Sequence, residues 1–235
     1  MMHTRLHHNV LGDVDVMRRR NSSRFSACWR GGVVRVTGPD YATDAQFMKA
    51  LDALAPKLLQ RREQHPVAGV AERIELDGIT IEMRRQGVNP DGIMLSPRIP
   101  VAILGLGNNV DIASVDGQRM YVKACRTIAY SVASQLLLPR AREIAAKLGC
   151  SPAGWKISRG STVLGTCSRT GLISISYMCV FLPAALRDYI VCHELAHLTH
   201  MDHSEAFHRL LDAYLGGEEQ RLVKELRNYR WPIPR

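Results

Sequence analysis

Residues 188–207 read DYIVCHELAHLTHMDHSEAF, and this stretch decides how the carboxyl-terminal part of the chain folds. It continues an apolar segment that Pro183 introduces, and proline is favoured in the first turn of a helix. The apolar spacing therefore predicts a helix that reaches about Thr199. His193 and His197 are four residues apart, so on a helix their imidazoles project from one face, a single turn apart.

Two imidazoles at this spacing can each direct a ring nitrogen at one cation, at about 2.0–2.1 Å for zinc. Glu194 follows His193 directly and is turned about 100° around the helix from it, which places its carboxylate beside the metal. A carboxylate in that position can take a proton from a metal-bound water, whose pKa zinc lowers to about 7. We therefore expect Zn²⁺ on His193 and His197, with Glu194 as the general base.

A catalytic zinc site needs a third protein ligand and an open fourth position, and we expect His203 to be that ligand. A helix break near Met201 and Asp202 could return its imidazole to the metal. The spacing from His193 equals that of the extended metzincin motif. His200 stands where that motif has glycine, and no methionine follows Met201 to form a Met-turn, so the chain is not an ordinary metzincin.

A glutamate from a later helix is the other way to complete such a site, as in thermolysin-like enzymes. Glu218 and Glu219 lie at about the right separation, although acidic residues directly after Gly216-Gly217 also simply favour a helix N-terminus. His200 could be a ligand, a hydrogen-bond donor to the site or a turn residue. Asp202 could orient a ligand imidazole or likewise serve the turn.

The first half of the chain reads as β-rich. Alternating residues 24–29 and 33–36 around Gly31-Gly32 predict a hairpin. Thr43 and Gln46 form a capping box, which predicts a helix over 44–63. Pro66 and Gly69 mark its end. Short apolar runs between glycine and proline turns predict four further strands, at 74–76, 79–83, 93–95 and 101–104.

The second half reads as mainly helical. Residues 121–148 predict a long amphipathic helix stopped by Gly149, and 171–176 alternate as a strand does. Ser204 can cap a helix ended by Gly216-Gly217, and a polar helix follows. The fold class is therefore α+β, with a β-rich amino-terminal half and a helical half that carries the HExxH helix. The expected modules are 1–66, 67–116 and 117–235, which could pack as one unit.

Composition narrows the class of protein. The chain has 235 residues, of which 46% are hydrophobic, enough for a sizeable core. No secretory signal or bilayer-spanning run is visible, and the six cysteines are scattered without a CxxC pair, so we expect a soluble cytoplasmic protein with reduced thiols. The net charge of +9 would favour anionic partners such as nucleotides, nucleic acid or acidic peptides.

Residues 188–207 closely resemble the YgjP-like metallopeptidase-domain family, which shares a zincin-type site with the SprT-like proteases. Upstream, residues 164–168 (LGTCS) and the strand after them are similar to the family's tryptophan-glycine-serine-cysteine-serine segment. The resemblance covers about residues 17–215. It implies a zincin-like domain over 117–235, with His193, His197 and His203 as zinc ligands and Glu194 as general acid and base.

Two residues depart from the family's pattern. Leu164 stands where the family has a tryptophan before the glycine, and His208 stands where it has a tryptophan after Phe207. Both positions could shape the pocket, so they bear on substrate preference and not on metal binding.

Peptide hydrolysis is the leading functional prediction. Zincins hold an extended substrate along an edge strand above the metal, and residues 171–176 are our candidate. The same residues could equally form a core strand with Ile173 and Ile175 turned inward. A donor for the transition-state oxyanion is also needed, and the sequence leaves four side chains open for it: Tyr177, Tyr189, Arg159 and His208.

Two other functions stay open. The family resemblance also implies a metal-dependent nucleoside triphosphate pyrophosphatase, in which Lys156, Arg159 and Arg169 would bind phosphates. No glycine-rich phosphate loop supports that activity. A nucleic-acid-associated protein with structural zinc is the third hypothesis. Glu194 argues against it, because a structural site needs no base and is usually closed by four protein ligands.

Overall fold

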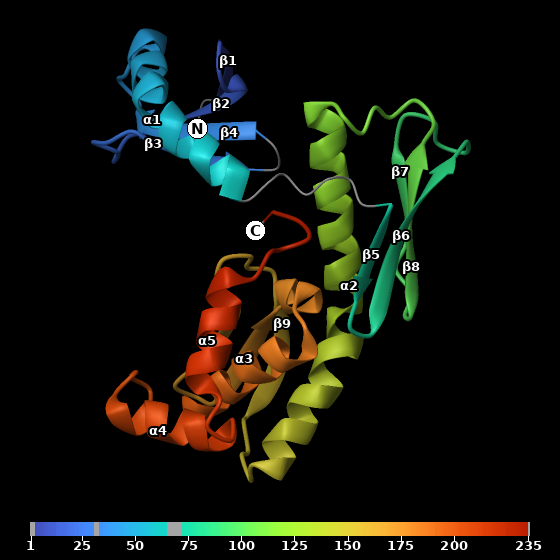
Figure 1. Cartoon of the computed structure of the whole chain (residues 1–235), viewed down its shortest axis with the longest axis vertical. Helices are drawn as coiled ribbons and strands as arrows, with labels where there is room; N and C mark the ends of the chain where they lie inside the picture. Colours follow the sequence, from blue (N-terminus) through green and yellow to red (C-terminus); the bar gives the residue numbers. More distant parts are fainter. Residues whose placement is uncertain (1–2, 31–32, 65–71, 235) are drawn as a thin grey trace. The chain divides into compact units, whose positions relative to one another are not determined.

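The computed structural model describes residues 3–30, 33–64 and 72–234 (Figure 1). These residues form an α+β fold with sheets in the amino-terminal half and helices in the carboxyl-terminal half, as the sequence predicts. The chain divides into two compact units, one with Met1–Val70 and Asp111–Val122 and the other with Ala71–Val110 and Lys123–Ile233. The three-module division expected from the sequence stays a prediction.

The first unit contains a four-stranded sheet, the helix α1 (Asp44–Gln64) and, within Asp111–Val122, the first turns of the long helix α2 (Val115–Lys147). Its strand order is β1-β2-β4-β3, with β2 parallel to β4 and the other pairs antiparallel. The core between sheet and helix includes the buried residues Val16, Val36, Phe47 and Leu51. The elements are β1 (His3–His8), β2 (Gly12–Arg19), β3 (Ser26–Arg30), β4 (Val33–Pro39) and α1 (Asp44–Gln64).

The hairpin and the capping box predicted for this unit are confirmed. Trp29 of β3 lies opposite Val34 of β4, while Gly31-Gly32 lies outside the described residues, as do Pro66 and Gly69. The Thr43 amide donates to Gln46 Oε1 at 2.9 Å, and the Gln46 amide donates to Thr43 Oγ1 at 3.3 Å. The sequence prediction missed β1 and β2.

The second unit begins with a four-stranded sheet of order β5-β6-β8-β7, followed by the long helix α2. All four strands expected here are present. The helix begins earlier than its apolar pattern suggests, because Ser114 caps it: Ser114 Oγ accepts from the Gly117 amide at 3.0 Å. The elements are β5 (Arg73–Leu76), β6 (Ile79–Gln86), β7 (Ile93–Ser96), β8 (Val101–Gly107) and α2 (Val115–Lys147).

A three-stranded sheet of order β10-β11-β9 follows, and it corrects one expectation. The alternating residues 171–176 form β11, which is the central strand and not an edge, with Ile173 and Ile175 buried. The core-strand alternative is therefore the right one, since a strand paired on both sides has no free main-chain groups along its length. The edge strands of this sheet are β10 and β9. The strands are β9 (Gly154–Ser158), β10 (Gly165–Cys167) and β11 (Leu172–Ser176).

Three helices complete the unit and pack on one another: α3 (Ala184–Ala196), α4 (Glu205–Tyr214) and α5 (Glu219–Asn228) (Figure 1). Helix α3 ends three residues before the expected Thr199, because its last turn tightens; the Thr199 amide bonds to the Ala196 carbonyl at 3.1 Å. Gly216 and Gly217 end α4 with φ of +65° and +88°. Among the described helices none is long and apolar enough to span a bilayer.

Asp77, in the turn between β5 and β6, caps the amino terminus of α3 from outside the helix. Its Oδ2 accepts from the Ala184 amide at 2.6 Å, and its carbonyl accepts from Arg187 Nη2 at 2.8 Å. Pro183 precedes α3 and makes no side-chain cap of its own, so Asp77 supplies the acceptor that this helix end needs. This turn thus helps to fix the helix that carries His193.

We expect Asp77→Ala to lower the free energy of unfolding by about 1 kcal/mol, the usual cost of losing a helix cap. The longer contact of Asp77 with Arg187, at 3.7 Å, adds little because the carboxylate is 58% exposed. Urea denaturation of Asp77→Ala, with Asp77→Asn as the control that keeps an acceptor oxygen, measures the effect. Equal stability of the alanine variant and the wild type would show that the cap is dispensable.

Candidate metal centre

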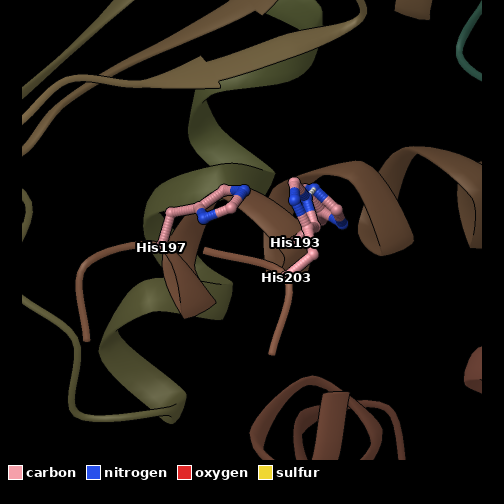
Figure 2. A group of neighbouring side chains, drawn as sticks. All are labelled: His193, His197 and His203. Atoms are coloured by element: carbon pink, nitrogen blue, oxygen red, sulfur yellow. Dashed lines mark hydrogen bonds between the residues drawn. The ribbon is translucent and has the colours of Figure 1, made fainter. Parts of the chain in front are cut away.

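Three imidazoles converge where α3 ends: His193 lies within the helix, His197 is its C-cap residue, and His203 precedes α4. Figure 2 shows the three rings turned toward one another. One ring nitrogen from each lies within 4.8 Å of the other two, and His193 Nε2 is 3.1 Å from His203 Nε2. Two nitrogens bound to a tetrahedral zinc stand about 3.3 Å apart. The geometry therefore fits a zinc-sized ion.

The protonation of this cluster also favours a metal. Burial, and secondarily the neighbouring imidazoles, lower the pKa of His193 to about 4, and burial likewise lowers the pKa of His203. A neutral imidazole has a lone pair to donate. His193 Nδ1 is buried without a hydrogen-bond partner in the described part of the chain. A cation between the apposed Nε2 atoms of His193 and His203 would bind one lone pair from each ring.

The ring of His197 is oriented by the turn that follows α3. Its Nδ1 lies 2.9 Å from the His200 carbonyl oxygen and donates to it, which leaves Nε2 for a metal. His200 therefore serves this turn through its main chain. Asp202 serves it as well, because its carboxylate accepts from the Ser204 amide at 3.3 Å. Neither residue belongs to the histidine cluster found among the described residues.

Phe207 of α4 forms an apolar wall behind all three imidazoles. It is fully buried, and its ring centroid lies 5.0, 4.6 and 4.8 Å from those of His193, His197 and His203. Such a wall restricts the rotation of the rings and keeps water from their rear side. The sequence prediction gave Phe207 no role, although helical spacing after Ser204 already placed it on the apolar face of α4.

Glu194 is buried on the same helix, 4% exposed, and burial raises the pKa of its carboxyl to about 7. It has no hydrogen-bond partner among the described side chains, so its oxygens are free to bind water or substrate. Gly165 of β10 lies directly against it: a Cβ built on Gly165 would stand 2.4 Å from Glu194 Oε1. The edge strand thus passes over the carboxylate, at a position where only glycine fits. The sequence analysis noted residues 164–168 only for their similarity to a family segment and did not predict a strand there.

The structure separates the four side chains considered as oxyanion donors. Tyr189 and His208 lie near the cluster, with ring centroids 6.0 Å from His193 and 6.4 Å from His203 respectively. Arg159 and Tyr177 instead both contact Tyr130 of α2, at 4.3 and 6.1 Å. Tyr189 and His208 are thus the two candidates for which a contact with a cluster histidine is seen.

The glutamates considered as a third metal ligand have other partners. Glu218 is exposed and forms an ion pair with Arg221, and Glu219 accepts from His208 Nδ1 at 2.6 Å. Neither belongs to the cluster formed by the histidines within the described residues. Glu219 is the first residue of α5, a position that favours acidic side chains in any helix.

The basic residues expected to bind phosphates do not gather at the histidines. Lys156 lies on β9, which β11 separates from β10. It pairs with Ser174, whose side chain faces the side of the sheet opposite to that of Ile175 and Gly165. Arg159 is stacked on Tyr130, and Arg169 is exposed in the turn between β10 and β11.

Comparisons with known proteins identify the family of the chain. The model of the YgjP-like metallopeptidase domain matches residues 27–229. Among solved structures, the metallopeptidase zymogen of Pyrococcus abyssi abylysin matches at a TM-score of 0.32 and 22% identity, over 39% of this chain and 96% of that one. That likeness is too weak to support an inference, and no curated protein matches. Because the family match spans most of the sequence, the chain belongs to the YgjP-like metallopeptidase-domain family.

Proposed function

We propose that the chain is a zinc-dependent peptidase, in which His193, His197 and His203 hold the ion and Glu194 is the general base. The observation that carries the proposal is the convergence of three imidazoles beside a buried carboxylate that has no hydrogen-bond partner among the described side chains. Membership of a metallopeptidase family supports hydrolysis of peptides. Three nitrogen donors, with no fourth protein ligand among the described residues, suit catalytic zinc better than magnesium or calcium, which prefer oxygen.

Each residue of the centre then has one task. Zinc bound there would supply a Lewis acid that polarises the scissile carbonyl and makes water acidic. Glu194 takes the proton of the attacking water and passes it to the leaving amine. The bond from His197 to the His200 carbonyl fixes the ring for its ligand role, and Phe207 holds the three rings in place. Tyr189 and His208 are the candidates for stabilising the oxyanion.

The free edge of β10 offers a substrate two main-chain positions beside Glu194. The Ser176 amide donates to the Leu164 carbonyl at 2.8 Å, and the Ser168 amide donates to the Leu172 carbonyl at 2.9 Å. Since hydrogen-bonded and non-bonded pairs alternate in an antiparallel ladder, the main-chain groups of Gly165 and Cys167 face away from β11. An extended peptide could pair with them as an added strand, which would bring a carbonyl near the base.

We expect Gly165→Ala to lower kcat by about 100-fold, the effect typical of displacing a catalytic group by about 1 Å. The new methyl group would occupy the position of the Glu194 carboxylate and push it aside. Zinc content should stay that of the wild type, because Gly165 does not touch the histidine ligands. Steady-state kinetics with zinc analysis measure both quantities. An alanine variant with unchanged kcat would mean that the position of Glu194 is not critical.

The substrate class is tested by offering the zinc-loaded chain an unstructured protein and nucleoside triphosphates, with Glu194→Gln as the control. Proteolysis that disappears in the variant is the expected result. Triphosphate cleavage that depends on Glu194, without proteolysis, would replace the peptidase with a pyrophosphatase. Salt-dependent DNA binding without either activity would favour the nucleic-acid-associated alternative.

A further inference from the structure

An open cavity of about 670 Å³ lies between α4 and α5. His208 of α4 lines one side of it, and a stripe of α5 that includes Val223, Lys224 and Arg227 lines the other. The ring of His208 lies 6.4 Å from that of His203. The cavity thus begins one side chain away from the proposed metal ligands.

The charges of α5 are distributed unequally over its faces. Arg221 forms ion pairs with Glu218 and, at 2.9 Å, with Glu225, so that face is neutralised within the helix. Lys224 and Arg227 are exposed, three residues apart on the cavity side, and make no ion pair with any described residue.

The one acid in the cavity lining, Glu219, does not offset these two cations. It is only 9% exposed, and its carboxylate binds His208 Nδ1 at 2.6 Å. A charged group entering from solvent therefore meets the ammonium of Lys224 and the guanidinium of Arg227 first. The cavity suits an anion, and guanidinium in particular matches the two oxygens of a carboxylate.

We propose that this cavity is a subsite that binds a carboxylate of the peptide substrate close to the scissile bond, with Lys224 and Arg227 as its partners. The proposal rests on the peptidase function proposed above. Successive residues of an extended peptide are about 3.3 Å apart. A group two or three residues from a carbonyl at the metal can therefore reach a cavity that starts at His208, whose ring lies 6.4 Å from that of His203. The carboxylate could belong to an aspartate or glutamate side chain or to the C-terminus of the substrate.

Binding and cleavage of matched peptides test this subsite. A neutral fluorescent peptide is varied by moving one Glu or Gln along it, with the C-terminus free or amidated. Kd is measured by anisotropy on the zinc-loaded Glu194→Gln chain, and kcat/KM on the chain with Glu194 intact. At one position in the peptide, we expect Glu to be favoured over Gln by about tenfold in both Kd and kcat/KM, as for a charge-assisted pair. Preference for the free over the amidated end would instead identify the C-terminus as the source of the carboxylate.

Variants of α5 connect the preference to the cavity. Lys224→Ala combined with Arg227→Ala should reduce the Glu-to-Gln ratio, or the ratio of free to amidated C-terminus, to about 1. Lys224→Glu combined with Arg227→Glu should favour a lysine-containing peptide. Arg221→Ala removes a cation from the neutralised face of the same helix and should keep the original ratio.

Equal Kd values for Glu and Gln peptides, and for free and amidated ones, would overturn the subsite. A preference that survives the double alanine substitution would do the same. Cleavage that requires Glu194 but shows no preference rejects the subsite and keeps the peptidase. Preferential binding without any cleavage keeps the subsite and rejects the peptidase.

Discussion

Replacing Glu194 with glutamine is expected to lower kcat for peptide hydrolysis by about 10³-fold, within the range that general acid-base catalysis supplies. The amide has nearly the shape of the carboxylate but cannot accept the proton of the attacking water. Because Glu194 has no partner among the described side chains, its replacement breaks no hydrogen bond that holds α3. The loss should therefore appear in kcat while folding and zinc content stay unchanged.

The matched control is Glu218→Gln, which changes an exposed glutamate of the same unit that binds only Arg221. It should retain wild-type kcat. Circular dichroism and atomic absorption on both variants confirm fold and metal content. If Glu194→Gln kept wild-type activity at equal zinc content, Glu194 could not be the base, and a different group would have to accept the proton.

His203→Ala is the second substitution with a large expected effect, and it should remove most of the bound zinc. Loss of an outer partner of a metal ligand typically costs 10–100-fold in affinity, so loss of one of three ligands should cost more than about 100-fold. Zinc should also raise the Tm of the wild-type chain by binding the folded state, and this increase should disappear in the variant. Competition with a chromophoric chelator measures the affinity directly.

Glu218→Ala and Glu219→Ala distinguish the histidine ligand from the glutamate alternative. Both should keep zinc, since Glu218 binds Arg221 and Glu219 binds His208. Zinc that is retained by His203→Ala and lost from Glu219→Ala would establish a thermolysin-like ligand set instead.

The part of the site that the sequence predicted is the part built by local spacing. His193 and His197 follow from one helical turn, and His203 is returned by a short turn only six residues after His197. The capping box of α1 and the glycine end of α4 are local as well. Such features depend on neighbouring residues alone, which a sequence displays directly.

What the sequence could not predict depends on contacts between distant residues. The cap of Ala184 by Asp77 spans 107 positions, and the contact of Gly165 with Glu194 joins a strand to a helix. Alternation in 171–176 indicated a strand but not its place in the sheet, because an edge strand and a central strand can share that pattern. The order of strands is a property of the whole unit, so only the structure shows that β10 is an edge strand and β11 the central one.

Zinc K-edge X-ray absorption on the zinc-loaded chain tests the central claim most directly. We expect three imidazole nitrogens and one further oxygen, all at about 2.0–2.1 Å from the zinc, in wild type and Glu194→Gln alike. In His203→Ala, any zinc that stays bound should have two imidazole ligands instead of three. A sulfur at about 2.3 Å, or four protein ligands in the wild type, would mean a closed structural site and would contradict a catalytic centre on His193, His197 and His203.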